Sequence, residues 1–253
     1  MKLIRAAIAK FRLSVFLLLI GGNLLLLLCG FAWLQIPDSH TWQFALSMVS
    51  ALLLVLTFCW IQVVALARLR RSSQPGPLWI RMLAFAVLFA VWLFLSQRIA
   101  SASGSIPLHA AYWNSRLSPG ARVVFTPMRI ASALSLALTF AQFLLAALII
   151  PPVLELGTRG LRGAKVGDLI RPWLRPLYWL AVIVAGCCAV FATHALVAWV
   201  PGHSVGIQTF SVLARLFVAW IFDAFLLLVV LSMAAATMDG PAANAEEPAT
   251  VAL

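Results

Sequence analysis

Six long apolar stretches constrain this chain more than any other feature of its sequence. Each is long enough for a helix to cross a hydrocarbon core of ~30 Å, which takes roughly 20 apolar residues. They cover residues 13–36, 41–67, 78–97, 130–154, 176–201 and 206–237. The strands of a membrane barrel would alternate apolar and polar residues over ~10 positions, and the run LLLLL at 24–28 does not alternate. The sequence therefore predicts an all-α, polytopic membrane protein with six transmembrane helices.

The composition excludes the main soluble alternatives. Of the 253 residues, 64% are hydrophobic and 10% are charged, whereas a soluble domain is ~45–50% apolar and ~25% charged. Too few charged residues remain to cover a surface that faces water. A soluble enzyme and a disordered chain are therefore excluded. The net charge of +11 does not indicate a nucleic-acid partner, because no basic domain stands clear of the apolar stretches.

The positions of Lys and Arg predict the orientation in the membrane. Twelve of them fall before the first stretch, between the second and third, or between the fourth and fifth, and Arg81, at the start of the third stretch, adds a thirteenth on that side; four fall in the opposite connections. Cytoplasmic loops carry such an excess, so we expect both termini in the cytoplasm and anionic headgroups as a partner on that side. The preference for Arg over Lys is typical of a GC-rich bacterial genome and indicates a bacterial inner membrane. Residues 1–238 are predicted as one transmembrane domain and residues 239–253 as a disordered cytoplasmic tail.

An internal similarity recurs at a spacing of 82 residues. Residues 50–58 read SALLLVLTF, residues 132–140 read SALSLALTF, and residues 214–222 end on a third phenylalanine in the same place. Repeats of the same orientation are related by an axis along the membrane normal. The pattern predicts three helical hairpins in a pseudo-threefold bundle. Chance alignment of helices rich in Leu and Ala is the alternative.

Two connections carry further expectations. The outer connection, residues 100–128, contains an aromatic segment at 108–117 that predicts a short helix on the membrane surface, with a lid over a central cavity as the alternative. The inner connection, residues 155–175, is predicted as a basic, turn-rich segment, with a glycine-lined phosphate cradle as the alternative. Pro151 and Pro152 should kink or end the fourth helix just before it.

Three ionisable side chains at membrane depth form the candidate polar site: Asp223, Arg215 and His194. Such residues are costly in a bilayer and are functional candidates by default. Asp223 is the strongest candidate, because its short side chain cannot reach water. Arg215 stands eight residues away, ~12 Å along a helix and ~80° around it, so a direct bond between the two is not expected. Arg215 could instead extend toward the outer surface.

The remaining polar residues predict packing rather than chemistry. Asn23, Gln62 and Gln142 can form hydrogen bonds across helices. The four cysteines all lie inside apolar stretches and are not spaced as metal or redox ligands. No catalytic residue, metal site or cofactor site is predicted.

Two functions fit this pattern. The first is a non-catalytic scaffold, accessory subunit or assembly factor of a membrane complex, with a membrane-protein partner or a second copy of the chain. The alternative is a small permease that moves a solute, ion or lipid and uses the polar cluster around Asp223. Water accessibility along the sixth stretch separates the two.

Overall fold

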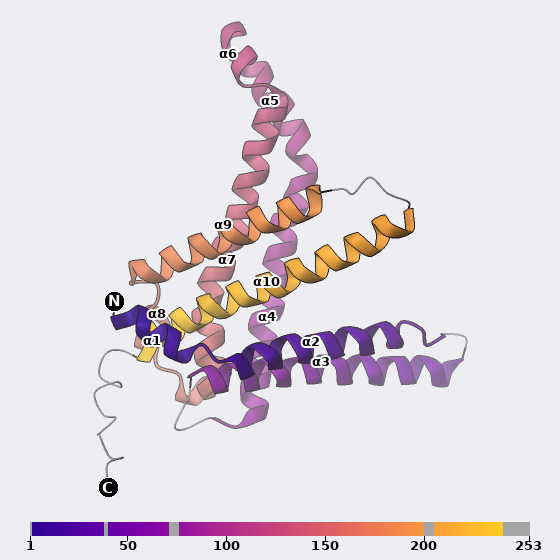
Figure 1. Cartoon of the computed structure of the whole chain (residues 1–253), viewed down its shortest axis with the longest axis vertical. Helices are drawn as coiled ribbons and strands as arrows, with labels where there is room; N and C mark the ends of the chain where they lie inside the picture. The colour runs from indigo at the N-terminus through magenta and orange to yellow at the C-terminus, as the bar shows by residue number, and fades with distance from the viewer. Residues whose placement is uncertain (1, 38–39, 71–75, 200–204, 240–253) are drawn as a thin grey trace. The chain divides into compact units, whose positions relative to one another are not determined.

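The protein was analysed as a computed structural model that describes residues 2–37, 40–70, 76–199 and 205–239 (Figure 1). Every regular element in these ranges is a helix. The prediction of six long apolar helices is confirmed, and by helix length and hydropathy the chain is a multi-pass membrane protein. These helices are α2 (Leu13–Trp33), α3 (Thr41–Arg70), α4 (Leu78–Ser101), α7 (Pro127–Gly163), α9 (Pro176–Ala198) and α10 (Val205–Asp239).

The chain divides into two compact units. Unit 1 comprises Met1–Ala86 and Pro151–Leu253, and unit 2 comprises Val87–Ile150. Both boundaries fall inside helices, in α4 and at the proline pair of α7.

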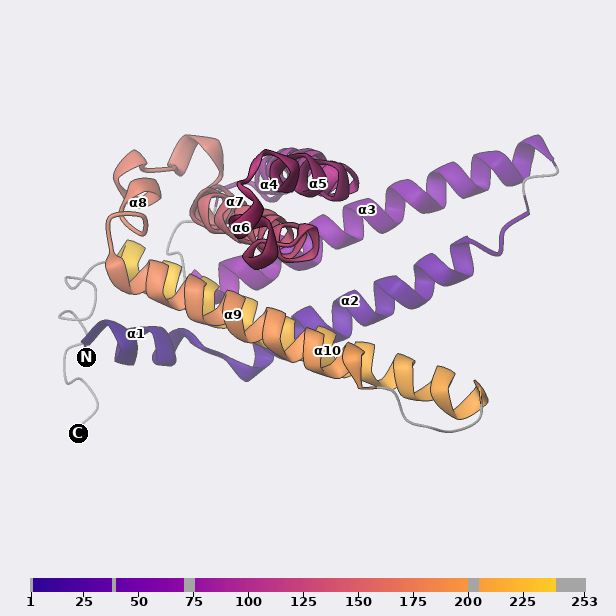
Figure 2. The ribbon, with the colours of Figure 1, turned by 90° about the horizontal axis from the view of Figure 1, so that it is seen from above.

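In unit 1, α2 packs along α3 and α9 packs along α10 (Figures 1 and 2). Gly22 permits close approach of the first pair, because a Cβ there would lie 3.0 Å from the side chain of Ile61. A hydrogen bond joins the same two helices: Gln62 of α3 donates to the Oδ1 of Asn23 in α2 at 3.0 Å. Asn23 in turn donates to the Leu19 carbonyl of its own helix at 2.7 Å. The predicted hydrogen bond across helices is confirmed for Asn23 and Gln62.

A short amphipathic helix, α1 (Lys2–Lys10), precedes the first long helix and packs against α10. Its buried Ala7 meets Met233 and Ala236 of α10. Two residues separate α1 from α2, and Phe11 in this break stacks edge-on against Phe225 at 5.4 Å between ring centroids. The start of the chain is thereby fixed to the C-terminal half of α10.

The end of α7 differs from the prediction. The helix runs through Pro151 and Pro152, and its non-helical residue is Gly160, with φ +71°. The region predicted as a turn-rich connection therefore contains the last turns of α7, followed by the five-residue helix α8 (Val166–Ile170). Burial explains the difference: Glu155 and Thr158 are fully buried in these turns, and tertiary contacts of this kind override local propensity.

In unit 2, the helix expected at residues 108–117 is present as α5 (Ile106–Arg116), but it continues from α4 through a 3₁₀ turn, η1 (Ala102–Ser105). Together they form one 39-residue helical stretch, roughly 58 Å at 1.5 Å per residue. The predicted separate helix on the membrane surface is therefore wrong, because α5 continues α4. The stretch is almost twice as long as a span of ~30 Å requires.

Two side chains of the outer connection, residues 100–128, form hydrogen bonds with backbone carbonyls farther along or farther back in the same connection. Asn114 donates to the Phe125 carbonyl at 2.6 Å, and Arg122 donates to the Ser115 carbonyl at 2.7 Å. These bonds close the turn around α6 (Pro119–Val124) before α7 begins. The structure does not test whether the three hairpins are equivalent, so the pseudo-threefold packing stays a prediction. The predicted tail lies outside the described residues except for Asp239, which ends α10.

Candidate functional site

Arg215, one of the three predicted site residues, is buried against the end of α9. Its Nη1 donates to the Leu196 carbonyl at 2.9 Å, its Nε donates to the Ser211 carbonyl at 3.1 Å, and its guanidinium stands 5.7 Å from the ring centroid of Trp199. Carbonyls in the last turn of a helix carry partial negative charge and favour a cation. Arg215 therefore caps α9 and reaches across to a neighbouring helix.

Asp223 and His194 are placed differently. Both side chains are exposed, Asp223 on α10 and His194 on α9. Neither forms a hydrogen bond or an ion pair with any residue that the structure describes. The structure thus brings no two of the three predicted residues into contact, and a shared polar site around Asp223 stays a prediction.

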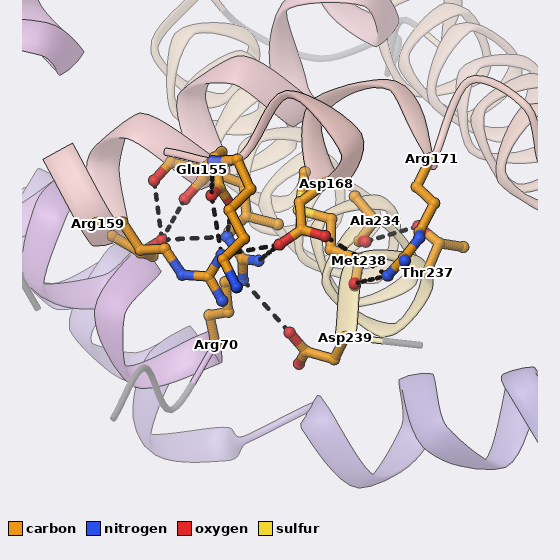
Figure 3. Close-up of polar contacts among 12 residues, drawn as sticks. Arg70, Glu155, Arg159, Asp168, Arg171, Ala234, Thr237, Met238 and Asp239 are labelled. Atoms are coloured by element: carbon orange, nitrogen blue, oxygen red, sulfur yellow. Dashed lines mark hydrogen bonds and ion pairs between the residues drawn. The ribbon is translucent and has the colours of Figure 1, made fainter. Parts of the chain in front are cut away.

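The structure instead gathers charged side chains at one end of unit 1, which we call the charged end. There the helix α1, the C-terminal ends of α3, α7 and α10, and the short helix α8 meet (Figure 3). We call the cluster the Arg70 network. Its members are Lys10, Arg70, Glu155, Arg159, Asp168, Arg171 and Asp239.

Arg70 is the centre of the network. Its side chain is 1% exposed and forms ion pairs with three carboxylates. Nη1 pairs with Glu155, Nη2 lies 3.2 Å from the Oδ2 of Asp168, and Nε lies 3.4 Å from the Oδ1 of Asp239. Because the three carboxylates come from α7, α8 and α10, one arginine at the end of α3 ties together four helices.

A second layer of donors surrounds the carboxylates. Arg159 places its Nη1 between Glu155 Oε1 at 3.1 Å and Asp168 Oδ2 at 2.8 Å. The backbone N–H of Lys165 also donates to Glu155, at 3.0 Å. These bonds hold the segment after the Gly160 kink against the last helical turns of α7.

The C-terminal end of α10 is fastened from two further sides. Asp239 forms an ion pair with Lys10 of α1. Arg171 donates to the Met238 carbonyl at 3.0 Å and lies 3.5 Å from the Oδ1 of Asp168 (Figure 3). The helix nearest the N-terminus and the last described helix are thus joined at the same end of the unit.

The charges of the network are nearly balanced. Four cations face three carboxylates, and Glu155 is 0% exposed. A buried charge is tolerated when it is paired and hydrogen-bonded, and here each carboxylate has at least two cationic partners. No carboxylate in the network is left without a cation, so the arrangement is suited to fastening helix ends together.

Sequence reasoning missed this site although one signal was present. The chain has only seven acidic residues, and the structure describes four of them: Glu155, Asp168, Asp223 and Asp239. Three of those four converge on Arg70. In the sequence alone, Arg70 counts only among the basic residues that indicate orientation, and Glu155 only as the first residue of the inner connection.

The described residues offer few other places for chemistry. A cavity between α2, α3 and α10 is apolar, and its one polar lining residue, Gln62, already bonds to Asn23. Within the described ranges, no group of three His, Cys, Asp or Glu side chains could hold a metal ion. Comparison of the chain with protein-family models, with curated proteins and with solved structures gave no match.

Proposed function

We propose that the protein is a non-catalytic scaffold or accessory subunit of a complex in a bacterial inner membrane. One observation carries the proposal: three of the four described acidic side chains pair with a single buried arginine and fasten helix ends. In a transporter or an intramembrane enzyme, carboxylates are more useful where they line a wet path or meet a substrate. Here the carboxylates of the Arg70 network hold helix ends together.

In this proposal Asp223 is a contact to a partner inside the membrane. A bare aspartate at the centre of a span costs ~2.5–3.5 kcal/mol on insertion scales. Arg215, the nearest cation on the same helix, is already bound to carbonyls of α9 and α10. A partner helix that donates a hydrogen bond or a cation to the exposed Asp223 would remove this cost.

A cysteine scan along α10 tests the proposal against a transport function. The four native cysteines, at positions 29, 59, 187 and 188, are first replaced, and single cysteines are then placed at 216, 220, 223 and 227. We expect none of these to react with a membrane-impermeant thiol reagent, because a scaffold holds α10 against lipid or protein. Arg162→Cys, exposed after the Gly160 kink, is the positive control, and the reagent is applied to opened membrane fragments so that it reaches both faces of the membrane. A labelled stripe at helical spacing that includes position 223 would indicate a water-filled path and a permease.

The proposed orientation places the charged end in the cytoplasm. The Lys10–Asp239 pair supports the expectation that both termini lie on one side, and the excess of Lys and Arg supports the cytoplasmic side. Reporter fusions after residue 115 and after residue 253 should report the periplasm and the cytoplasm respectively. The same location for both fusions would contradict the six-span topology.

We also infer that the six helices form three hairpins with pseudo-threefold symmetry. The packing of α2 on α3 and of α9 on α10 supports the first and third hairpins. The equal spacing of Phe58, Phe140 and Phe222 supports the repeat itself.

A further inference from the structure

A second buried arginine lies at the charged end and has no counterion. Arg81 is the fourth residue of α4 and is 9% exposed. Its Nε is fully enclosed, and its guanidinium forms no hydrogen bond or ion pair with any residue in the described ranges. Arg70, buried to a similar degree, has three carboxylate partners. The contrast makes Arg81 an unexplained charge.

Arg81 cannot escape the cost of burial by losing its proton, because a guanidinium stays charged in proteins. A buried charge without a partner is strongly destabilising. The surroundings add positive potential: the amides of Leu78, Trp79 and Ile80 begin the helix and donate to no described acceptor. Unsatisfied amides of a first turn carry partial positive charge, and helical side chains lean back toward that turn.

The protein supplies no described anion for this position. The carboxylates at the charged end belong to the Arg70 network, and Asp223 is exposed far along α10. The neighbour of the Arg81 side chain is instead Gly160: a methyl group placed on Gly160 would lie 3.6 Å from Cγ of Arg81. A bare glycine with a left-handed backbone therefore borders the arginine on that side.

We propose that Arg81 and the first turn of α4 bind a phosphate group. The guanidinium fork matches phosphate oxygens in a bidentate geometry, and the first turn of a helix provides amide donors to the same group. The phosphate has two possible sources, the headgroup of an anionic phospholipid and free phosphate. Because α4 enters an apolar span directly after Arg81, the site stands at the depth of phospholipid headgroups. This inference does not depend on the scaffold function.

The test measures lipid and phosphate binding by the full-length protein purified in a maltoside detergent. Native mass spectrometry gives the apparent Kd for phosphatidylglycerol and for phosphatidylcholine, and thermal unfolding is followed with and without inorganic phosphate. The wild type should retain phosphatidylglycerol in preference to phosphatidylcholine, whose choline cation opposes Arg81. Arg81→Gln should raise the apparent Kd for phosphatidylglycerol at least about tenfold, the loss expected for a charge-assisted bidentate contact.

The matched control is Arg98→Gln, which removes an exposed arginine near the other end of α4. It should leave the apparent Kd for phosphatidylglycerol unchanged. If Arg81→Gln is not recovered folded, Arg81→Lys is compared with Arg98→Lys, because lysine keeps the charge but loses the bidentate fork. An effect of Arg81→Lys alone then supports the site.

Four results distinguish the two sources of phosphate from a failure of the proposal. Tight phosphatidylglycerol binding that depends on Arg81 identifies a lipid site. Stabilisation of the wild type by inorganic phosphate, lost in Arg81→Gln, without lipid preference identifies a site for free phosphate. The proposal is overturned if neither probe binds in an Arg81-dependent way. It is equally overturned if Arg81→Gln is more stable than the wild type with phosphatidylglycerol present, as relief of an unliganded buried charge would produce.

Discussion

Replacing Arg70 by glutamine should destabilise the protein by about 3–5 kcal/mol, the range measured when one partner of a buried ion pair is removed. Glutamine cannot neutralise Glu155, which is fully buried, and it also leaves Asp168 and Asp239 with one cation fewer. The ion pairs that join α3 to α7, α8 and α10 are lost together. Thermal unfolding of the purified protein, followed by tryptophan fluorescence, measures the loss.

Arg68→Gln is the matched control for this prediction. Arg68 precedes Arg70 by two residues on the same helix but is exposed. Surface substitutions of this kind change stability by only ~0.5 kcal/mol. Equal effects of the two substitutions would show that the loss follows from charge alone and not from the buried contacts of Arg70.

The second large effect is expected at Gly76, just before α4. A Cβ at this position would collide with the backbone carbonyl oxygen of Arg159. A backbone atom cannot rotate away as the tip of a side chain can, so Gly76→Ala must displace the segment that carries Arg159. Overpacking costs ~1–3 kcal/mol, and displaced Arg159 would also move away from Asp168, which its Nη1 contacts at 2.8 Å. We therefore expect a loss at the upper end of that range in the same unfolding assay.

Gly167→Ala provides the comparison, because Gly167 also lies in unit 1, close in sequence to Asp168, and a Cβ there would meet nothing within 4 Å. Gly167 is helical, in α8, and alanine is favoured over glycine in a helix by up to ~1 kcal/mol. The substitution should be neutral or slightly stabilising. A loss at Gly167 equal to that at Gly76 would mean that the close approach to Arg159 is not the cause.

The six long helices could be predicted because their signal is local. An uncharged run such as residues 13–36 must be a helix in lipid, since every backbone N–H and C=O has to be satisfied within the segment. The end of α7 could not be predicted in the same way. Pro151 and Pro152 indicate a helix end by local rules, yet the helix continues for about two further turns, in which Glu155 is buried, and the break lies at Gly160.

The contacts of the candidate site could not be predicted, because they depend on how the helices pack against one another. Depth in the membrane follows from sequence position, so Asp223, Arg215 and His194 could be identified as costly residues. Their neighbours depend on which helix faces they occupy, and the structure gives Arg215 carbonyl partners while leaving Asp223 and His194 exposed. The Arg70 network joins residues as far apart as positions 10 and 239. Only the packing of helix ends brings these together.

A double-mutant cycle between Arg70 and Glu155 tests most directly whether the network is a structural tie. Unfolding free energies are measured for the wild type, Arg70→Gln, Glu155→Gln and the double variant. Because each single substitution removes one partner of the buried Arg70–Glu155 pair, the double variant should lose less stability than the sum of the two, by ~1–3 kcal/mol. Effects that add within ~0.5 kcal/mol would show that the two residues do not act as a buried pair, and the account of a fastened charged end would be wrong.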